Sequence, residues 1–317
     1  MTMIDNLLDA TIIFFVVGLL AGVLRSEVKL PESIYEILSM YLLLAIGLKG
    51  GVQLATTQLG VIVIPAAGTL ALGLVIPLIA FIVLRRLGRL GRADAAAIAA
   101  HYGSVSAVTY AVVLVFLERR GVSYEEYTTV LLVLLEVPAI AVGILLAKRG
   151  AAQAPVSASR LFREVFLGKS IYLLLAGLCA GFVLGPAGIA PVKIVFVDPF
   201  KGALAFFLLE MGLVTSRRLH ELRKVGLFLV IFGMGMPLLS GTLGALVAWM
   251  AGLSVGGATI LATLAASASY IAAPAAMRIA VPDANPTLYL TSALGITFPF
   301  NLVVGIPVYH WLATVIR

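Results

Sequence analysis

The sequence predicts an all-α membrane protein with ten transmembrane helices, arranged as two inverted repeats of five, with one broken crossing helix in each repeat. Three observations carry this prediction. The 317-residue chain is 62% hydrophobic and only 12% charged, far from the composition of a soluble globular domain. The stretch from Val225 to Met277 has no charged residue, which leaves room for two spans of about 20 residues each. Finally, motifs of the first half recur in the second at a nearly constant spacing.

The apolar runs divide the chain into ten expected spans. They lie at residues 7–24, 33–48, 59–84, 93–118, 124–147, 165–185, 200–215, 225–251, 255–277 and 286–315. Because five spans per half is an odd number, the second half has to be inverted relative to the first. The predicted domains are therefore a first repeat over residues 1–149, a proline-containing cytoplasmic linker over 150–162, and a second repeat over 163–317.

Lysine and arginine collect on one side of this predicted bundle. Of the 22 basic residues, sixteen fall on one side, and the other side has only Lys49, Arg119, Arg120, Lys193, Lys201 and Arg317. By the positive-inside rule the richer side is cytoplasmic, so both termini face outward from a bacterial-type inner membrane. The net charge of +7 is thus a topology signal, and we expect membrane lipid but no nucleic acid as a partner.

Each half contains an apolar helix interrupted by small hydroxyl residues. The first interruption lies within residues 101–109 and the second within 265–274. Ser104 aligns with Ser267, and Ser106 aligns with Ser269, at the same offset of 163 residues. A duplicated membrane protein with one broken helix per half is typical of secondary transporters, whose binding site forms where the two breaks meet.

An unwound segment inside a membrane needs partners for its open backbone groups. Half-helix N-termini suit a small anion, while hydroxyl and carbonyl oxygens suit Na⁺. The expected substrate site consists of the residues of the two interruptions, namely Ser104, Val105, Ser106, Thr109, Ser267, Ala268, Ser269 and Tyr270. The competing interpretation of any single serine is a hydrogen bond to the carbonyl one turn back.

One carboxylate inside an apolar run extends the expected cation site. Glu136 closely precedes Pro138, which frees nearby backbone carbonyls, and a buried membrane carboxylate usually faces a cavity or a partner. The offset that relates Pro138 to Pro299 pairs Glu136 with Thr297, another oxygen ligand. The predicted Na⁺ ligands are therefore Ser106, Thr109, Glu136, Ser269 and Thr297.

An enzyme is the less favoured interpretation. His101 and Ser104 are three residues apart and could touch on a helix, as an intramembrane hydrolase requires, but nothing in the sequence orients the histidine as a base. The sequence also has no zinc-protease or phosphate-binding loop motif. Two non-enzymatic hypotheses stay open beside the transport of a small inorganic anion: a Na⁺-coupled carrier of a small carboxylate, and a membrane anion sensor that recruits a cytoplasmic partner.

Nearly the whole chain resembles the sodium-dependent bicarbonate permease family (SbtA-like). The segments that carry the resemblance are residues 48–51, 103–109, 122–125, 136–139, 220–225 and 279–286. The resemblance implies Na⁺-coupled bicarbonate uptake by an elevator mechanism, in which a core with both broken helices moves against a scaffold. It also implies a homotrimer and a PII-like cytoplasmic regulator.

The chain departs from the family pattern inside the expected site. Family members typically have glycine and serine where this chain has Ala107 and Val108, and serine and aspartate where it has Ala268 and Tyr270. Glu136 stands where an aspartate is typical. We therefore predict a sodium-coupled symporter of bicarbonate or a similar small anion.

Overall fold

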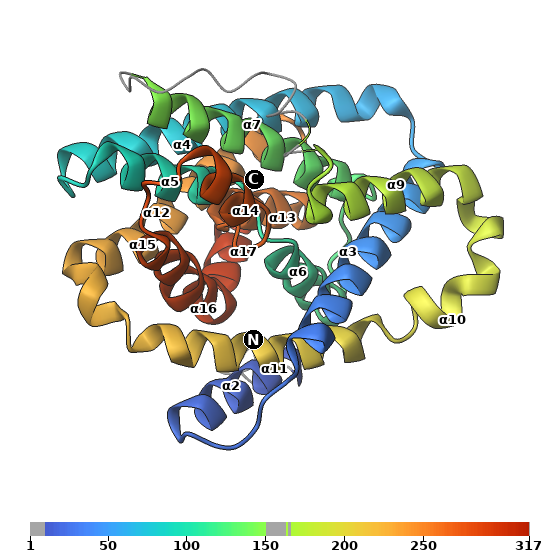
Figure 1. Ribbon diagram of the computed structural model, residues 1–317. Coiled ribbons are helices and arrows are strands. Elements are labelled where there is room, and N and C mark those ends of the chain that lie inside the picture. The colour runs from blue at the N-terminus through green and yellow to red at the C-terminus, as the bar shows by residue number, and fades with distance from the viewer. Residues whose placement is uncertain (1–9, 150–162, 164–165, 317) are drawn as a thin grey trace.

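The computed structural model describes residues 10–149, 163 and 166–316, and every regular element in this part of the chain is a helix (Figure 1). The predicted linker over 150–162 lies outside the described residues. The helices of the first half are α2 (Ala10–Val23), α3 (Glu32–Leu54), α4 (Val63–Arg86), α5 (Arg92–Gly103), α6 (Ala107–Arg119) and α7 (Thr128–Lys148). A 3₁₀ turn, η1 (Leu59–Ile62), precedes α4.

The second half has a more irregular backbone. Its helices are α9 (Lys169–Gly188), α10 (Lys193–Phe196), α11 (Phe200–Leu219), α12 (Leu222–Met250), α13 (Val255–Ala266), α14 (Ala272–Ala280), α15 (Pro286–Leu290), α16 (Phe298–Phe300) and α17 (Ile306–Val315). The 3₁₀ turn η2 (Ala190–Val192) precedes α10. The final helix contains two π-helical stretches, η3 (Thr291–Thr297) and η4 (Asn301–Gly305), which are common at functional sites.

The packing of the outer helices is mirrored between the halves. Helix α3 packs against α9, and α11 packs against α2 (Figure 1). Glycines allow both approaches, because a Cβ on Gly47 would overlap the carbonyl oxygen of Leu174, and one on Gly212 would overlap that of Phe15. Such small-residue contacts let membrane helices pack backbone to backbone.

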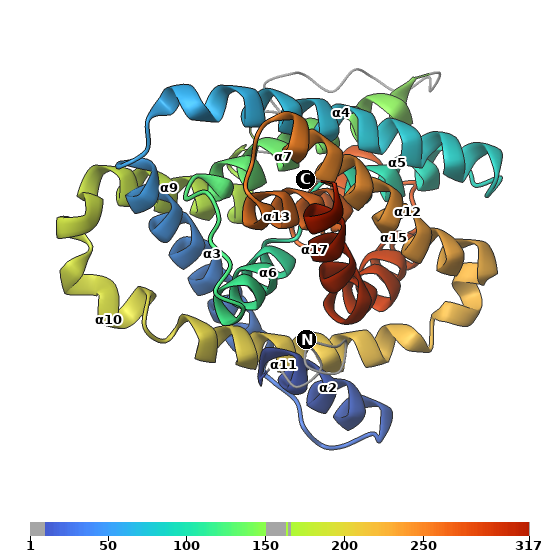
Figure 2. The same cartoon turned by 180° about the vertical axis from the view of Figure 1, so that it is seen from behind.

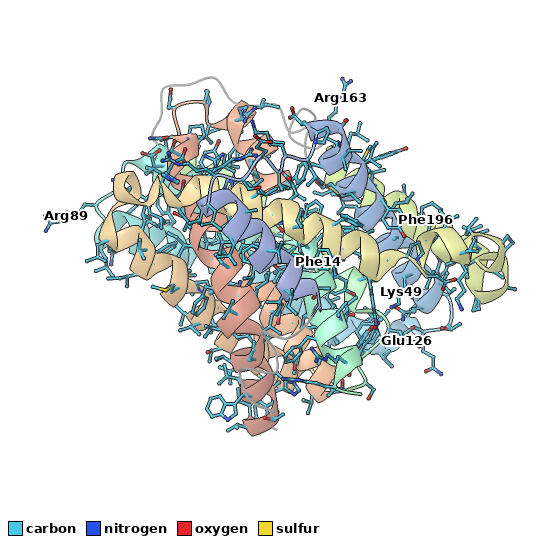
Figure 3. The ribbon with its side chains drawn as sticks, turned by 90° about the horizontal axis from the view of Figure 1, so that it is seen from below. Phe14, Lys49, Arg89, Glu126, Arg163 and Phe196 are labelled. Atoms are coloured by element: carbon cyan, nitrogen blue, oxygen red, sulfur yellow. The ribbon has the colours of Figure 1, made fainter. Side chains whose placement is uncertain are left out.

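The two broken helices, α5–α6 and α13–α14, occupy the centre of the molecule (Figures 1 and 2). Helices α4 and α7 pack on α5, while α12 and α17 pack on α13. Residues 95–106 and 108–117 of the first broken helix are all buried, whereas Arg89, which precedes it, projects from the edge of the molecule (Figure 3). The unwound backbone is therefore enclosed by protein, as it has to be at membrane depth.

Large apolar side chains are exposed on the outer helices. They include Leu20 of α2, Leu74 of α4, Val183 of α9 and Leu227 of α12. A surface of this kind is unfavourable in water but matches the hydrocarbon interior of a bilayer. The chain is accordingly a multi-pass membrane protein.

Seven described helical segments are long and apolar enough to cross a membrane, compared with the ten spans that we expected. The segments Thr11–Val23 and Val255–Ala266 are apolar but shorter. Helix α11 has the charged residues Lys201, Glu210, Arg217 and Arg218 within its 20 residues. The ten-span count in two inverted repeats stays a prediction.

Candidate functional site

The first break separates α5 from α6 at Ser104, Val105 and Ser106. Both serines have extended backbone, with ψ values of 179° and 110°. The Ser106 hydroxyl caps α6 by accepting hydrogen bonds from the Thr109 backbone N–H at 3.1 Å and from the Thr109 hydroxyl at 2.9 Å. Gly103 ends α5, where a Cβ would lie 2.7 Å from the ring of Pro77. A glycine is thus needed where α4 closes on the break.

The second break separates α13 from α14 over residues 267–271 and is two residues longer than the first. The Ser267 hydroxyl donates to the Leu264 carbonyl at 2.8 Å. The Ser269 hydroxyl accepts from the Ala273 backbone N–H at 3.2 Å, which satisfies one open donor in the first turn of α14.

The two breaks contact each other through two hydrogen bonds. The Ser106 backbone N–H donates to the Ser267 hydroxyl at 3.0 Å. The Ser269 backbone N–H donates to the His101 carbonyl at 2.8 Å. Helices α6 and α14 begin at this junction, while α5 and α13 end there. The positive ends of two helix dipoles and the negative ends of two others therefore meet in one place, which suits an anion beside a cation.

Three polar atoms at the junction are buried and lack a hydrogen-bond partner among the described residues. They are the Ser104 hydroxyl, the Tyr270 hydroxyl and Nε2 of His101. The phenol of Tyr270 lies near the side chain of Ser106, and its ring packs edge-on against Phe298 with centroids 5.4 Å apart. Unpaired buried groups are rare in native proteins, so each of these atoms is a candidate ligand contact.

His101 has a packing role in the structure rather than the geometry of a proton-transfer group. Its Nδ1 is 2.6 Å from the Ala97 carbonyl, one turn back, and its ring stacks on Tyr289 with centroids 4.5 Å apart. The described residues include no carboxylate hydrogen-bonded to this ring. The arrangement holds the imidazole in place and gives it no catalytic partner.

The expected cation ligands divide into two groups. Ser106, Thr109 and Ser269 are buried at the junction. Glu136 is buried in α7, one turn before Ala139, whose Cβ lies 2.8 Å from the position of a Cβ on Gly103. Residues three apart share a helix face, so Glu136 lies on the side of α7 that packs against the first break.

Thr297 has other partners. Its hydroxyl is 2.6 Å from the Tyr102 hydroxyl and donates to the Gly233 carbonyl at 2.7 Å. These hydrogen bonds tie the π-helical stretch η3 to α5 and α12. The structure therefore places Thr297 in a buried network beside the junction, separate from the hydrogen bonds that join the two breaks.

Asn301, a weaker candidate in the sequence, supports the second break directly. Its side-chain amide donates to the Ala266 carbonyl at the end of α13, at 2.9 Å, and its carbonyl oxygen accepts from the Tyr309 hydroxyl at 2.8 Å. Its position two residues after Pro299 was the one available sequence signal. The π-helical register that aims it at Ala266 is not visible in the residue pattern.

Each broken helix is also fixed at its far end by a loop of the other half. Glu125, between α6 and α7, accepts hydrogen bonds from the backbone N–H and hydroxyl of Ser254 at the start of α13. Asp94, in the first turn of α5, accepts from the Asn285 backbone N–H at 2.7 Å. Hydrogen bonds therefore join the two halves at the breaks and at the N-terminal ends of α5 and α13.

A cavity reaches toward each break. One of about 330 Å³ lies between α3, α6 and α11 and extends to Tyr110, whose backbone N–H bonds the Ser106 carbonyl at 3.0 Å. Another of about 180 Å³ is lined by Lys169 of α9 and extends to Ile271 and Ala272 at the second break. The described residues include no cluster of histidine, cysteine, aspartate or glutamate that could hold a metal ion. Hydroxyl, carbonyl and single carboxylate oxygens are the donors present, a set that suits Na⁺.

Comparison with known proteins gives one finding that covers nearly the whole chain. A family model described as the Na⁺-dependent bicarbonate transporter superfamily matches residues 10–314. No curated protein matches the sequence. The family match includes both breaks and both cavities.

Proposed function

The chain belongs to the Na⁺-dependent bicarbonate transporter superfamily, and we propose that it is a symporter that couples Na⁺ to bicarbonate uptake across the inner membrane. It is a membrane transporter and not an enzyme. The observation that supports the proposal best is the meeting of the two breaks, through the hydrogen bond from Ser106 to Ser267 and the one from Ser269 to His101.

In this proposal the anion binds at the start of α6 and α14. Bicarbonate is small, planar and able both to accept and to donate hydrogen bonds. The Ser104 and Tyr270 hydroxyls, which have no partner among the described residues, would donate to it. Backbone N–H groups in the first turns of the two helices add partial positive charge without a buried lysine or arginine.

The cation binds beside the anion at the same junction. Ser106, Thr109 and Ser269 offer hydroxyl oxygens, and Glu136 supplies the negative charge on the adjoining face of α7. Sodium beside the anion would cancel part of its charge, so each ion would improve the affinity for the other. Thr297 has a positioning role here, because its hydroxyl is already bonded to Tyr102 and Gly233.

Transport requires the junction to open to each side in turn. We extend the proposal to ten spans in two inverted repeats, with residues 1–149 and 163–317 as the repeats and both termini outside. The mirrored packing of α3 on α9 and α11 on α2 supports this symmetry. The elevator movement, the homotrimer and the PII-like regulator follow from the family resemblance and stay predictions.

Uptake into proteoliposomes tests the function directly. Labelled bicarbonate should accumulate when an inward Na⁺ gradient is applied and should not when an equal K⁺ gradient replaces it. Vesicles without protein control for passive CO₂ permeation. Equal bicarbonate uptake in the two gradients would refute Na⁺ coupling.

A second candidate is a Na⁺-coupled carrier of another small carboxylate. The observation that favours it is the aromatic wall formed by Tyr270 and Phe298, which offers apolar surface where family members typically have a smaller acidic residue. A carboxylate with a short hydrocarbon part could pack on these rings. A competition panel of unlabelled small carboxylates against labelled bicarbonate separates the two candidates.

A further inference from the structure

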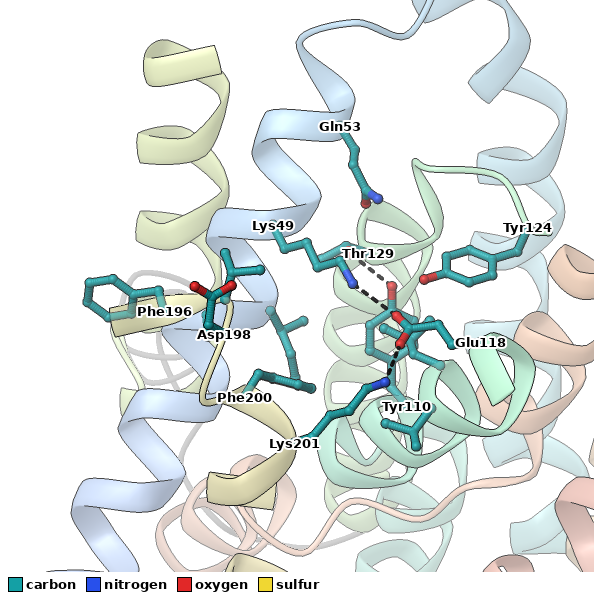
Figure 4. A pocket seen from close by; sticks show the side chains of 15 residues that line it. Lys49, Gln53, Tyr110, Glu118, Tyr124, Thr129, Phe196, Asp198, Phe200 and Lys201 are labelled. Atoms are coloured by element: carbon teal, nitrogen blue, oxygen red, sulfur yellow. Dashed lines mark hydrogen bonds and ion pairs between the residues drawn. The ribbon is translucent and has the colours of Figure 1, made fainter. Parts of the chain in front are cut away.

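The cavity between α3, α6 and α11 has a charged mouth and an apolar interior. Lys49 of α3, Glu118 of α6, and Asp198 and Lys201 at the start of α11 lie around it (Figure 4). Deeper along α6 it is lined by Val115, Leu114 and Tyr110. From Glu118 to Tyr110 the helix advances by about 12 Å, at 1.5 Å per residue. We call this cavity the funnel.

One carboxylate holds both lysines at the mouth of the funnel. Nζ of Lys49 is 3.2 Å from Oε1 of Glu118, and Nζ of Lys201 is 3.1 Å from Oε2 (Figure 4). Each oxygen therefore binds one ammonium group, and the two ammonium groups come from different helices. The side chains are 41%, 63% and 33% exposed for Lys49, Lys201 and Glu118 respectively. Ion pairs with this much solvent exposure are weak and exchange readily with dissolved ions.

The Glu118 carboxylate has the shape and charge of a small oxyanion. Bicarbonate, like a carboxylate, presents two oxygens on one planar carbon. Lysine carries a flexible point charge that can donate to either a bicarbonate or a carboxylate. The negative charges of Glu118 and Asp198 neutralise the positive charges of the two lysines. An incoming anion therefore binds more favourably when it replaces the Glu118 carboxylate than when it binds beside it. Beyond this point the funnel extends to Tyr110, one helical turn after Ser106 at the first break, and the Tyr110 hydroxyl is hydrogen-bonded to Thr128 and Thr129 of α7.

We propose that Lys49 and Lys201 form an anion-recruiting site at the mouth of the funnel, where the carboxylate of Glu118 occupies the place of an incoming bicarbonate or small carboxylate. The anion exchanges with Glu118 and then passes along α6 to the junction of the two breaks. This inference rests on the proposed anion transport, and it adds a second, weaker site that the anion occupies first.

A purely structural role for the same cluster makes a different prediction. If Glu118 serves only to hold α6 against α3 and α11 through its ion pairs, loss of any of the three charges weakens this packing. All three variants then shift the KM for bicarbonate in the same direction. If Glu118 competes with the anion, loss of a lysine weakens anion recruitment, whereas loss of Glu118 frees both lysines and strengthens it. The sign of the Glu118 effect therefore separates the two roles.

The experiment measures the initial rate of Na⁺-driven uptake of labelled bicarbonate against its concentration, for Lys49→Gln, Lys201→Gln and Glu118→Gln. The matched control is Lys193→Gln, because Lys193 is an exposed lysine at the start of α10 that does not line the funnel. We expect a 3- to 10-fold rise in the KM for bicarbonate for each funnel lysine variant, and a smaller rise at high ionic strength. Glu118→Gln should lower this KM at least twofold, and Lys193→Gln should leave it unchanged.

Three results would overturn the inference: a KM in Glu118→Gln that does not fall, an unchanged KM in both funnel lysine variants, or the same rise in Lys193→Gln. Thermal unfolding of each variant in detergent confirms that the comparison is between folded proteins. The Lys49→Gln Lys201→Gln double variant keeps the inference testable if Glu118→Gln does not fold, since its KM should exceed that of either single variant. Failure of the proposed function gives a different outcome, because wild-type uptake would then not depend on the Na⁺ gradient.

Discussion

Replacement of Ser104 by alanine should stabilise the protein and weaken anion binding at the same time. The Ser104 hydroxyl is fully buried and has no partner among the described residues. A buried polar group in this condition costs about 1–3 kcal/mol, and the alanine variant removes that cost without opening a cavity larger than a hydroxyl. If the hydroxyl donates to the anion in the wild type, the variant loses a hydrogen bond to a charged group, worth about 1.5–3 kcal/mol. This corresponds to roughly a 10- to 100-fold weaker anion affinity.

Ser267→Ala is the matched control, because it removes the same atom from the other break. The Ser267 hydroxyl donates to the Leu264 carbonyl and accepts from the Ser106 backbone N–H. Its loss leaves a buried N–H without its partner, so this variant should be less stable than the wild type by about 1–3 kcal/mol. The two serine-to-alanine changes should therefore shift the Tm in opposite directions.

One thermal unfolding series in detergent measures both quantities. The Tm without substrate reports stability, and the rise in Tm on addition of Na⁺ and bicarbonate reports affinity through linkage. For Ser104→Ala we expect a higher Tm without substrate and a smaller rise with it. A lower Tm without substrate would mean that Ser104 has a stabilising partner. An undiminished substrate-induced rise would remove Ser104 from the anion site.

Three further predictions follow from the same contacts. Ser106→Ala should lose about 1 kcal/mol of stability, because Ser106 caps α6, and Ser254→Ala should lose at least as much, because Ser254 caps α13 and also donates to Glu125. Only Ser106→Ala should also raise the KM for Na⁺. An equal KM for Na⁺ in the two variants would mean that Ser106 is only a helix cap. Gly47→Ala should lower the yield and Tm of folded protein, because the added Cβ would overlap the backbone of α9. Gly235→Ala, which has open space around it, should have a nearly unchanged Tm. An equal Tm in the two variants would contradict the close packing of α3 on α9. Thr297→Val should lower the Tm through the loss of two buried hydrogen bonds and leave the Na⁺ affinity within about twofold. A tenfold weaker Na⁺ affinity in that variant would place Thr297 among the ligands.

The positions of the breaks could be predicted from the sequence because local chemistry determines them. Ser104, Ser106, Ser267 and Ser269 compete with the helical hydrogen bonds through their hydroxyls, and small neighbours leave room for the unwound chain. The duplicated spacing then predicted that the breaks correspond. In the structure α5 ends at Gly103 and α13 at Ala266, which are separated by the same 163 residues as the serine pairs.

Other parts of the site depend on contacts that no local pattern contains. Asn301, at the start of the π-helical stretch η4, donates to the Ala266 carbonyl 35 residues earlier in the chain, a contact that no local pattern contains. Helix α12 contains two glycines and a proline within residues 233–237, yet its non-helical backbone is at Gly226. A Cβ on Gly233 would lie 2.7 Å from Ile296, so the glycine allows a close crossing with η3. The funnel brings together charges from three helices, and their alignment depends on how α6 packs beside α3 and α11.

The two breaks depend on each other for their structure, and this dependence bears on how the ions are coupled. The Ser106 backbone N–H bonds the Ser267 hydroxyl, and the Ser269 backbone N–H bonds the His101 carbonyl in the last turn of α5, so displacement of either broken helix costs the other a hydrogen bond. A cation bound at Ser106 and Thr109 would fix the first break, and through the Ser106 backbone N–H it would also hold Ser267 in place. The anion would then meet donors from both breaks already in position, which reduces the ordering cost of its binding. Coupling of this kind requires no direct contact between the two ions. It predicts that variants which break the junction reduce the dependence of bicarbonate affinity on Na⁺ more than they reduce either affinity alone.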